Sequence, residues 1–514
     1  MRLSRKDLMI EHKDEVHKLA ARISLLRFTK YTKLDYVADK FHEILCSALD
    51  RFLRNVIAKK SPRMMIMAPP RSGKSELVSR RFPALALGKY PDLKILATSH
   101  GSELASAMNR DVQRIIDDTS YVKLFPRTRL SGAGVRYDRS GTYLRNSDVF
   151  EIVNHSGMYR SAGVGGALLG FGGNILIIDD PIKNSEEAHS QTVRDSIWAW
   201  YQSAFYTRCE PGAGILIMHQ RWHEDDLAGR LLINMKKGGE QWEVLSFPAI
   251  AEQDESFRKV GEALCPSRFS LERLECIRIG TEDEVGVGSR AWDALYQQRP
   301  SSKSGEYFKR ENWQYIKLDP EFFMWDAKAK RKYMTQILGV NKLIQAWDTA
   351  IGAKKVNDFA ACTTLGVTKN RYIAFEVWRD RVKYPEMRRE VQTRSDAWCP
   401  DVIVIEGGGA AAGKAVIQDL RPETRLPLKE VPTDKDKELR ADMLSPIHEA
   451  GRCALPEGAS WVSSFVDVAS QFPNVKNDDD LDSWMLAMEE AKTGPKPLVI
   501  SDELLVWSAQ PGRR

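Results

Sequence analysis

The sequence predicts an α/β fold with two sheet-containing domains, because two separate series of short apolar runs follow one another along the chain. In the first series, runs such as 95–97 and 175–178 alternate with helical stretches and Gly-rich turns. That alternation is typical of a parallel sheet with crossover helices. The second series begins with the run that ends in Trp347-Asp348 and continues to the run 402–405. Its order of strand, strand, strand, helix, strand indicates a second α/β domain.

The chain has 514 residues, of which 43% are hydrophobic and 28% charged. This composition is typical of two or three domains with full cores, and it excludes a disordered tail or a small disulfide scaffold. The apolar runs are too short to cross a bilayer, and acidic residues interrupt the N-terminus before any apolar core, unlike a signal peptide. Seven scattered cysteines without a C-x-x-C pair argue against a zinc site. We therefore expect a soluble, cytoplasmic protein with reduced thiols.

The formal net charge is +6, and the excess of basic residues lies within the first 60 residues. This is a weak indication of a polyanionic partner, and a solvated helix face explains it equally well. Helical spacing of apolar residues in the same segment predicts two or three helices. By periodicity we divide the chain into a helical lead-in at 1–60, a first domain at 61–300, a linker at 301–335, a second domain at 336–495 and a tail at 496–514.

A phosphate-binding loop is predicted directly after the apolar run 64–67. The loop consists of Ala68, Pro69, Pro70, Arg71, Ser72, Gly73, Lys74 and Ser75. Between a strand and a helix, the amides of such a loop face phosphates, its lysine reaches the β- and γ-phosphates, and its hydroxyl joins a Mg²⁺ shell. Arg71 is a further candidate for phosphate contact. Ala68 stands where the pattern asks for glycine, so a chance G-K-S in a loop is the alternative.

Paired carboxylates at the end of the apolar run 175–178 strengthen this prediction. We expect Asp179 to hold Mg²⁺ through water and Asp180 to polarise the attacking water, with Glu186 or Glu187 as alternatives for that base. An Asp turn before Pro181 is the structural alternative.

Two further stretches are candidates for the same site. The Gly-rich stretch around Arg160 predicts a mobile loop that presents a charge to a neighbouring subunit's γ-phosphate. His219, Gln220 and Arg221 end a buried strand, where they either sense the γ-phosphate or form a solvent-facing turn.

Three separated acidic groups indicate a second site, because each lies at the end of a predicted element. Asp348 and Glu406 end apolar strands, and the run Asp478, Asp479, Asp480, Asp482 opens a helical stretch. If they converge, two Mg²⁺ or Mn²⁺ ions would neutralise them and align water against a phosphodiester, which is nuclease chemistry. Singly, each acid is more often a turn or an N-cap. Four cations between the groups are candidates for DNA backbone contacts or for a solvated loop: Lys429, Lys435, Lys437 and Arg440.

These motifs together resemble the large terminase subunit of tailed bacteriophages, over most of the chain. The matching residues are Phe41-His42-Glu43, the loop 68–75, residues 178–181, RWHEDDLAGR at 221–230, YQQRP at 296–300, Trp347-Asp348-Thr349, Ile405-Glu406 and residues 478–482.

The resemblance implies an N-terminal ATPase of the additional-strand type and a C-terminal nuclease similar to ribonuclease H. By position, Lys74 and Ser75 would bind ATP and Mg²⁺, Asp179 would hold that metal, and Phe41 and His42 would lie at the adenine. Asp348, Glu406, Asp478, Asp479 and Asp482 would bind the two nuclease metals. Many relatives have Glu where this chain has Asp180.

The function implied is a packaging motor that translocates double-stranded viral DNA into a procapsid and cuts concatemeric DNA. Its partners would be a portal protein, a small terminase subunit and other copies of itself, five in a ring, in the host cytoplasm and transiently at the portal vertex. An ATP-dependent repair or defence nuclease is the alternative, but 514 residues leave little room for its helicase modules. A decayed, non-catalytic scaffold would lack Lys74, Asp179, Asp348 or Glu406, and all four are present.

Overall fold

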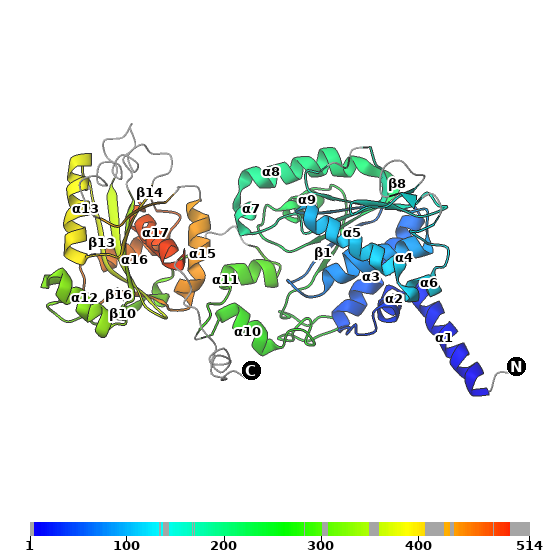
Figure 1. The fold of residues 1–514 in the computed structure, drawn as a ribbon, viewed down its shortest axis with the longest axis horizontal. Helices are drawn as coiled ribbons and strands as arrows, with labels where there is room; N and C mark the ends of the chain where they lie inside the picture. The colour runs from blue at the N-terminus through cyan, green and yellow to red at the C-terminus, as the bar shows by residue number, and fades with distance from the viewer. Residues whose placement is uncertain are drawn as a thin grey trace, which may run out of the picture. The chain divides into compact units, whose positions relative to one another are not determined.

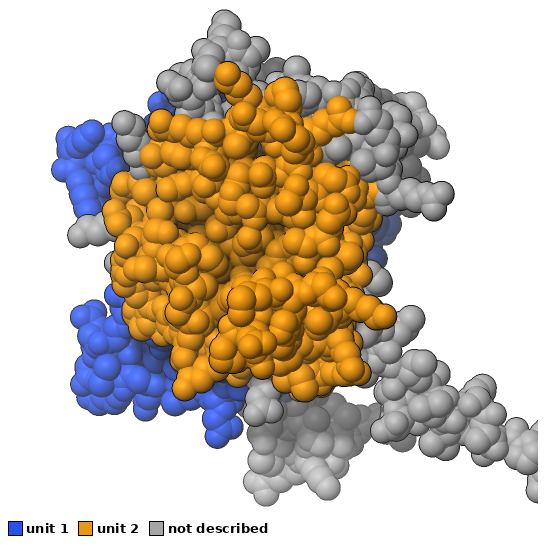
Figure 2. All heavy atoms as spheres, turned by 90° about the vertical axis from the view of Figure 1, so that its left-hand side faces the viewer, with its two compact units in different colours: residues 1–281, 286–303 blue, residues 282–285, 304–514 orange. Residues whose placement is uncertain are grey.

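The computed structural model divides the chain into two compact units, residues 1–281 with 286–303 and residues 282–285 with 304–514 (Figure 2). The residues that the structure describes are 5–132, 135–136, 143–166, 168, 170–281, 283–300, 307–348, 359–406, 426–431, 436–475 and 477–493. No helix in these ranges is long and apolar enough to cross a membrane.

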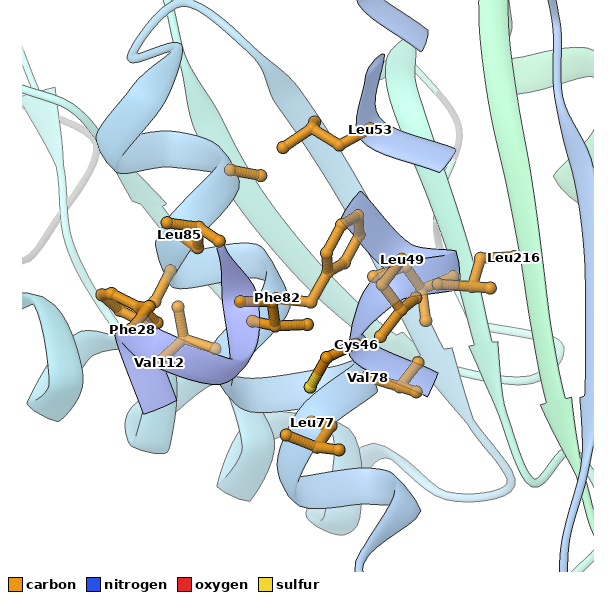
Figure 3. Packing of buried hydrophobic residues seen from close by; sticks show 14 of the residues in the cluster. Phe28, Cys46, Leu49, Leu53, Leu77, Val78, Phe82, Leu85, Val112 and Leu216 are labelled. Atoms are coloured by element: carbon orange, nitrogen blue, oxygen red, sulfur yellow. The ribbon is translucent and has the colours of Figure 1, made fainter. Parts of the chain in front are cut away.

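Three helices begin the first unit, which confirms the helical lead-in (Figure 1). They are α1 (Arg5–Ile23), α2 (Leu25–Thr32) and α3 (Lys40–Ile57). The apolar residues of α3 recur at helical spacing, so Leu49 and Leu53 are buried on one face. Figure 3 shows this face packed near Phe82 and Leu216, which belong to other elements of the unit. The lead-in is therefore part of the core of the first unit.

The first sheet has seven strands in the order β5-β6-β2-β7-β8-β1-β9. All neighbouring pairs are parallel except β5 with β6. Its strands are β1 (Arg63–Met67), β2 (Lys94–Ser99), β5 (Val149–Glu151), β6 (Met158–Gly163), β7 (Gly173–Asp179), β8 (Cys209–His219) and β9 (Glu243–Ser246). The central strands are buried on both faces, as expected for a parallel sheet with crossover connections. Since β8 lies between β1 and β7, the additional-strand arrangement is confirmed.

The helices that connect and cover these strands complete the first unit. A π-helical turn (Glu76–Arg81) precedes α4 (Phe82–Lys89), followed by α5 (Ser102–Asp117), α6 (Thr119–Leu124), α7 (Ser185–His189), α8 (Gln191–Trp200), α9 (Leu227–Lys236), α10 (Leu271–Ile279) and α11 (Ser289–Ala291). A short pair, β3 (Val135–Arg136) and β4 (Tyr143–Leu144), lies outside the main sheet.

The second sheet also has seven strands, in the order β10-β16-β13-β12-β11-β14-β15. β11, β12 and β13 form an antiparallel meander, and β14 and β15 continue it in parallel with β11. The strands are β10 (Gln314–Ile316), β11 (Lys342–Asp348), β12 (Ala360–Val367), β13 (Tyr372–Asp380), β14 (Val402–Glu406), β15 (Leu428–Val431) and β16 (Cys453–Pro456). With α13 (Tyr384–Trp398) between β13 and β14, the predicted order of elements is confirmed.

Four other helices belong to this second unit. They are α12 (Ala327–Gln336), α15 (Lys437–Glu449), α16 (Val462–Gln471) and α17 (Asp479–Thr493). α17 packs against β11 and β12, and its Trp484 and Met485 are buried in the core.

The sequence predicts a linker over 301–335, whereas residues 307–335 fold as part of the second unit. β10 pairs with β16, and the side chains of Phe308 and Trp313 are buried in the same core as Trp484. The elements here are too short to give a sustained hydrophobic period, which is why the sequence pattern looks like a connection.

Candidate functional site

The loop 68–75 leaves the carboxyl end of β1 and leads into the π-helical turn (Glu76–Arg81). Lys74 is buried, with 4% of its side chain exposed, and its Nζ donates a hydrogen bond to the Pro69 carbonyl at 3.3 Å. Gly73 has φ +92°, and a Cβ there would lie 3.0 Å from Nε2 of His42. The backbone conformation and this close approach both require glycine, so the loop is tightly folded in the context that the sequence predicts.

His42 anchors the loop from α3. Its Nδ1 accepts a hydrogen bond from the Asp39 amide at 2.9 Å, so Nε2 carries the proton and donates to the Ser72 carbonyl at 2.8 Å. Burial lowers the pKa of His42, which keeps the ring in this neutral form. The expectation that Phe41 meets adenine is wrong in this structure, because the ring is fully buried and packs edge-to-face on Phe247.

Asp179 and Asp180 lie at the carboxyl end of β7, on the same sheet edge as the loop. Burial, reinforced by the neighbouring charge of Asp180, raises the pKa of Asp179 to about 7, and Ser79 donates a hydrogen bond to its Oδ2. Asp180 is also buried, but Lys74 and His219 more than offset that effect and hold the pKa of Asp180 below its ordinary value. Asp180 Oδ2 lies 3.9 Å from Lys74 Nζ, so an ionised carboxylate faces the loop lysine.

The polar residues at the end of β8 hold Asp180 in place. The Gln220 amide donates to Asp180 Oδ1 at 2.7 Å, and the Gln220 side chain donates to Oδ2 at 3.0 Å. Asp180 has φ +46°, a strained conformation for a residue with a Cβ, which these contacts fix. Glu186 is exposed, and the Glu187 carboxylate accepts the Lys183 amide at 2.9 Å beside its own helix. Of the three candidates for the base, Asp180 is therefore the one beside Lys74.

The structure contradicts the predicted loop at Arg160. This residue lies in β6, paired with Leu96 of β2, and its guanidinium stacks on the Phe171 ring at 4.1 Å. The Gly-rich sequence begins only at Gly163, after the strand, which explains the error.

Asp226 is a buried acid that the sequence patterns above do not single out. It is fully buried and accepts hydrogen bonds from Arg221 Nε at 2.9 Å and from the Gly229 amide at 2.8 Å, while His219 Nε2 lies 3.2 Å away. It therefore caps α9 and neutralises two buried side chains from the end of β8. An Asp immediately before an apolar helical run is an N-cap signal that could have identified it.

We expect Asp226→Ala to lower the free energy of unfolding by about 3–5 kcal/mol at neutral pH, because Arg221 would be left buried without its partner. Its cationic neighbours hold the pKa of Asp226 below its ordinary value, although burial opposes them. A carboxyl group with a lowered pKa adds stability above about pH 4 and loses that contribution in acid. Urea unfolding should therefore show the difference from wild type shrinking as the pH falls; a constant difference would contradict the ionic explanation.

The second unit brings its predicted acids together at one edge of its sheet. β11 and β14 are parallel with Trp347 paired to Ile405, so Asp348 and Glu406 end neighbouring strands. α17 begins at the same place and contributes Asp479 and Asp482. Burial, followed by the negative charges of Asp482 and Glu406, raises the pKa of Asp348 well above its ordinary value. The acids separated in sequence therefore form one electrostatically coupled cluster.

Two basic residues of α15 face this acidic cluster. Lys437 Nζ lies 2.9 Å from Asp478 Oδ1 and also forms an ion pair with Asp482. Arg440 is buried and its Nη2 donates to Glu406 Oε1 at 2.8 Å.

The expectation of exposed cations for a DNA backbone is wrong for Arg440, because its helix faces inward. Lys429 pairs with Glu490 at 2.6 Å on the second unit's sheet, and Lys435 lies outside the described residues. The sequence interval between the acids contains a strand and a helix, which position these side chains.

Two family models match the chain. The N-terminal model of the terminase large subunit, T4likevirus-type, covers residues 65–314, and the terminase RNaseH-like domain covers residues 345–491. Together they span most of the sequence, one in each unit. The chain belongs to the terminase large-subunit family. A terminase large subunit combines the ATPase and the nuclease of viral DNA packaging, so this chain is an enzyme with both activities.

Solved terminase structures also resemble this terminase. The large terminase of a thermophilic bacteriophage is 10% identical, with 86% of this chain and 99% of that chain covered and a TM-score of 0.42; the complex of the same protein with ADP gives 9%, the same coverage and 0.43. The large terminase nuclease of thermophilic phage G20c with bound magnesium is 11% identical over 36% of this chain and 98% of that chain, with a TM-score of 0.27. These similarities are low, and the assignment rests on the family models. No curated protein sequence matched the chain.

The acidic cluster of this terminase fits hard divalent cations. Its donors are carboxylate oxygens, the ligands that Mg²⁺ and Mn²⁺ prefer. Burial raises the pKa of Asp482 to about 6, and its Oδ1 is buried without a hydrogen-bond partner among the described residues. An unpaired buried carboxylate oxygen among like charges is stabilised by a cation.

Proposed function

We propose that this terminase hydrolyses ATP in its first unit to translocate double-stranded DNA into a procapsid and cuts concatemeric DNA with a metal-dependent endonuclease in its second. The observation that supports this most directly is the existence of two separate charged sites at sheet edges. One pairs a loop lysine with ionised Asp180, and the other gathers acids from two strands and a helix. The first suits phosphoryl transfer to water and the second suits phosphodiester cleavage.

In the ATPase, the amides of residues 68–75 and the Lys74 ammonium bind the phosphates, with Arg71 as a further contact. Ser75 and Asp179 hold Mg²⁺, which when bound neutralises charge on the phosphate oxygens. Asp180 accepts the proton of the attacking water. Its low pKa keeps it ionised, and the two hydrogen bonds from Gln220 fix its orientation.

In the nuclease, Asp348, Glu406 and Asp479 form the catalytic set, and Asp478 and Asp482 complete the ligands for two Mg²⁺ or Mn²⁺. The bound ions activate water and stabilise the leaving oxygen of the cleaved phosphodiester. Arg440 holds Glu406 by its hydrogen bond at 2.8 Å, so the end of β14 presents this carboxylate in one orientation. Lys437 keeps Asp478 and Asp482 together.

The family implies interactions with DNA, a portal protein and a small terminase subunit. We further propose that several copies, five in the working motor, assemble as a ring at the portal vertex of the procapsid in the host cytoplasm. A ring provides a neighbouring subunit for each ATP site, and translocation requires contacts to the DNA backbone without base readout.

The proposal is tested with the purified full chain, supercoiled plasmid, ATP and either Mg²⁺ or Mn²⁺. We expect ATP hydrolysis, measured by phosphate release, and plasmid cleavage, measured on agarose gels, with cleavage abolished by a chelator. ATP-driven unwinding of the duplex would instead favour a repair or defence nuclease. A folded protein with neither activity would contradict the proposal.

A further inference from the structure

The segment after β9 packs against the phosphate loop and fixes the position of one exposed arginine. Cys265 is buried in the core of the first unit, and its Sγ lies 3.8 Å from the Ser72 carbonyl oxygen. Ser267 Oγ donates a hydrogen bond to Asp39 Oδ2 at 2.6 Å, which ties the segment to the start of α3. The backbone on the amino side of Arg268 is therefore anchored to both the loop and the helix that supports it.

The Arg268 guanidinium lies directly over the loop. Its Nη2 is 3.1 Å, and its Cζ 3.2 Å, from the position of a Cβ on Gly73. The same positive charge contributes, after burial, to the lowered pKa of His42. The Arg268 side chain is exposed, and it forms no hydrogen bond or ion pair with the part of the chain that the structure describes.

An unpaired guanidinium held beside a phosphate loop has a specific use. Lys74 already faces Asp180 at 3.9 Å, so part of its charge is balanced within the protein. Arg268 has no such partner among the described residues and can donate two parallel hydrogen bonds to phosphate oxygens. Without an anion, its position beside the loop that carries Lys74 brings like charges together, which a bound polyanion would offset.

We infer that Arg268 binds the phosphate chain of the nucleotide in the same subunit. This inference rests on the proposed ATPase function. It assigns to the segment after β9 a direct role in nucleotide binding, because a nucleotide would join this segment to the loop through Arg268.

The test measures the affinity of the full chain for MgADP and the slowly hydrolysed MgATPγS by titration calorimetry. Arg268→Ala should weaken both by about tenfold, the effect of losing a charge-assisted hydrogen bond, and Arg268→Lys should recover part of the loss. Lys259→Ala is the control, since it removes one exposed cation from the same unit, at a residue whose ammonium pairs with Asp254. The Tm of each variant without nucleotide should equal that of wild type.

The outcomes separate the inference from the function on which it rests. If wild type binds both nucleotides and Arg268→Ala binds them equally well, the assignment of Arg268 is wrong and the ATPase proposal stands. If Lys259→Ala weakens binding as much as Arg268→Ala, the effect is one of general charge and the inference is also overturned. If wild type binds neither nucleotide, the ATPase proposal itself fails.

Discussion

Replacing Lys74 with alanine is expected to reduce ATP hydrolysis by at least about a hundredfold while the full chain still cuts DNA in the presence of Mg²⁺ or Mn²⁺. Lys74 is the buried cation that faces Asp180, and it lowers the pKa of that carboxyl group. Its loss removes a phosphate contact and also raises the pKa of the proposed base, so both effects slow hydrolysis. Phosphate release and plasmid cleavage, measured on the same preparation, check the result.

Lys123→Ala is a suitable control, because Lys123 is an exposed lysine of α6 in the same unit. It should leave both activities at the wild-type level. Loss of both ATP hydrolysis and cleavage in a folded Lys74→Ala protein would contradict two independent active sites.

Asp348→Asn is expected to abolish DNA cleavage and leave ATP hydrolysis unchanged. The substitution preserves shape but removes a carboxylate from the acidic cluster, so a metal ligand is lost. It should also raise the Tm of the metal-free protein. Because burial and neighbouring acids raise the pKa of Asp348 well above its ordinary value, its ionised form destabilises the folded state. A group with a raised pKa contributes stability at low pH that is lost as the pH rises, so the stabilisation by Asn should appear above about pH 4 and grow toward neutrality.

Asp396→Asn, on the exposed surface of α13, is the matched control and should change neither cleavage nor the Tm. Adding Mg²⁺ should raise the Tm of wild type more than that of Asp348→Asn. Persistent cleavage by Asp348→Asn would remove this residue from the proposed metal site.

Both sheets could be predicted from the sequence because their strands are continuous apolar runs that end in polar residues. The loop 68–75 and the acids Asp179 and Asp348 follow such runs directly, so a local pattern was sufficient. The contacts that organise each site were not predicted, because they depend on which elements become neighbours. Nothing near His42 in the sequence indicates a hydrogen bond to Ser72, 30 residues away. The inward orientation of Arg440 likewise depends on how α15 packs in the second unit.

The residues from 307 to 335 illustrate a second limit of sequence patterns. β10 has only three residues, and it is stabilised by pairing with β16, which lies far along the chain. A strand of this length has no detectable alternation of its own.

The ion pairs of Lys437 have a consequence for how the second unit is made. Its ammonium sits between Asp478 and Asp482, where it offsets part of the repulsion among the acids before any metal is present. Folding and metal loading are thereby two successive equilibria, unlike the single coupled transition of a zinc finger, which is unfolded without its ion. A newly made chain can complete its core in a metal-poor environment and acquire its ions afterwards.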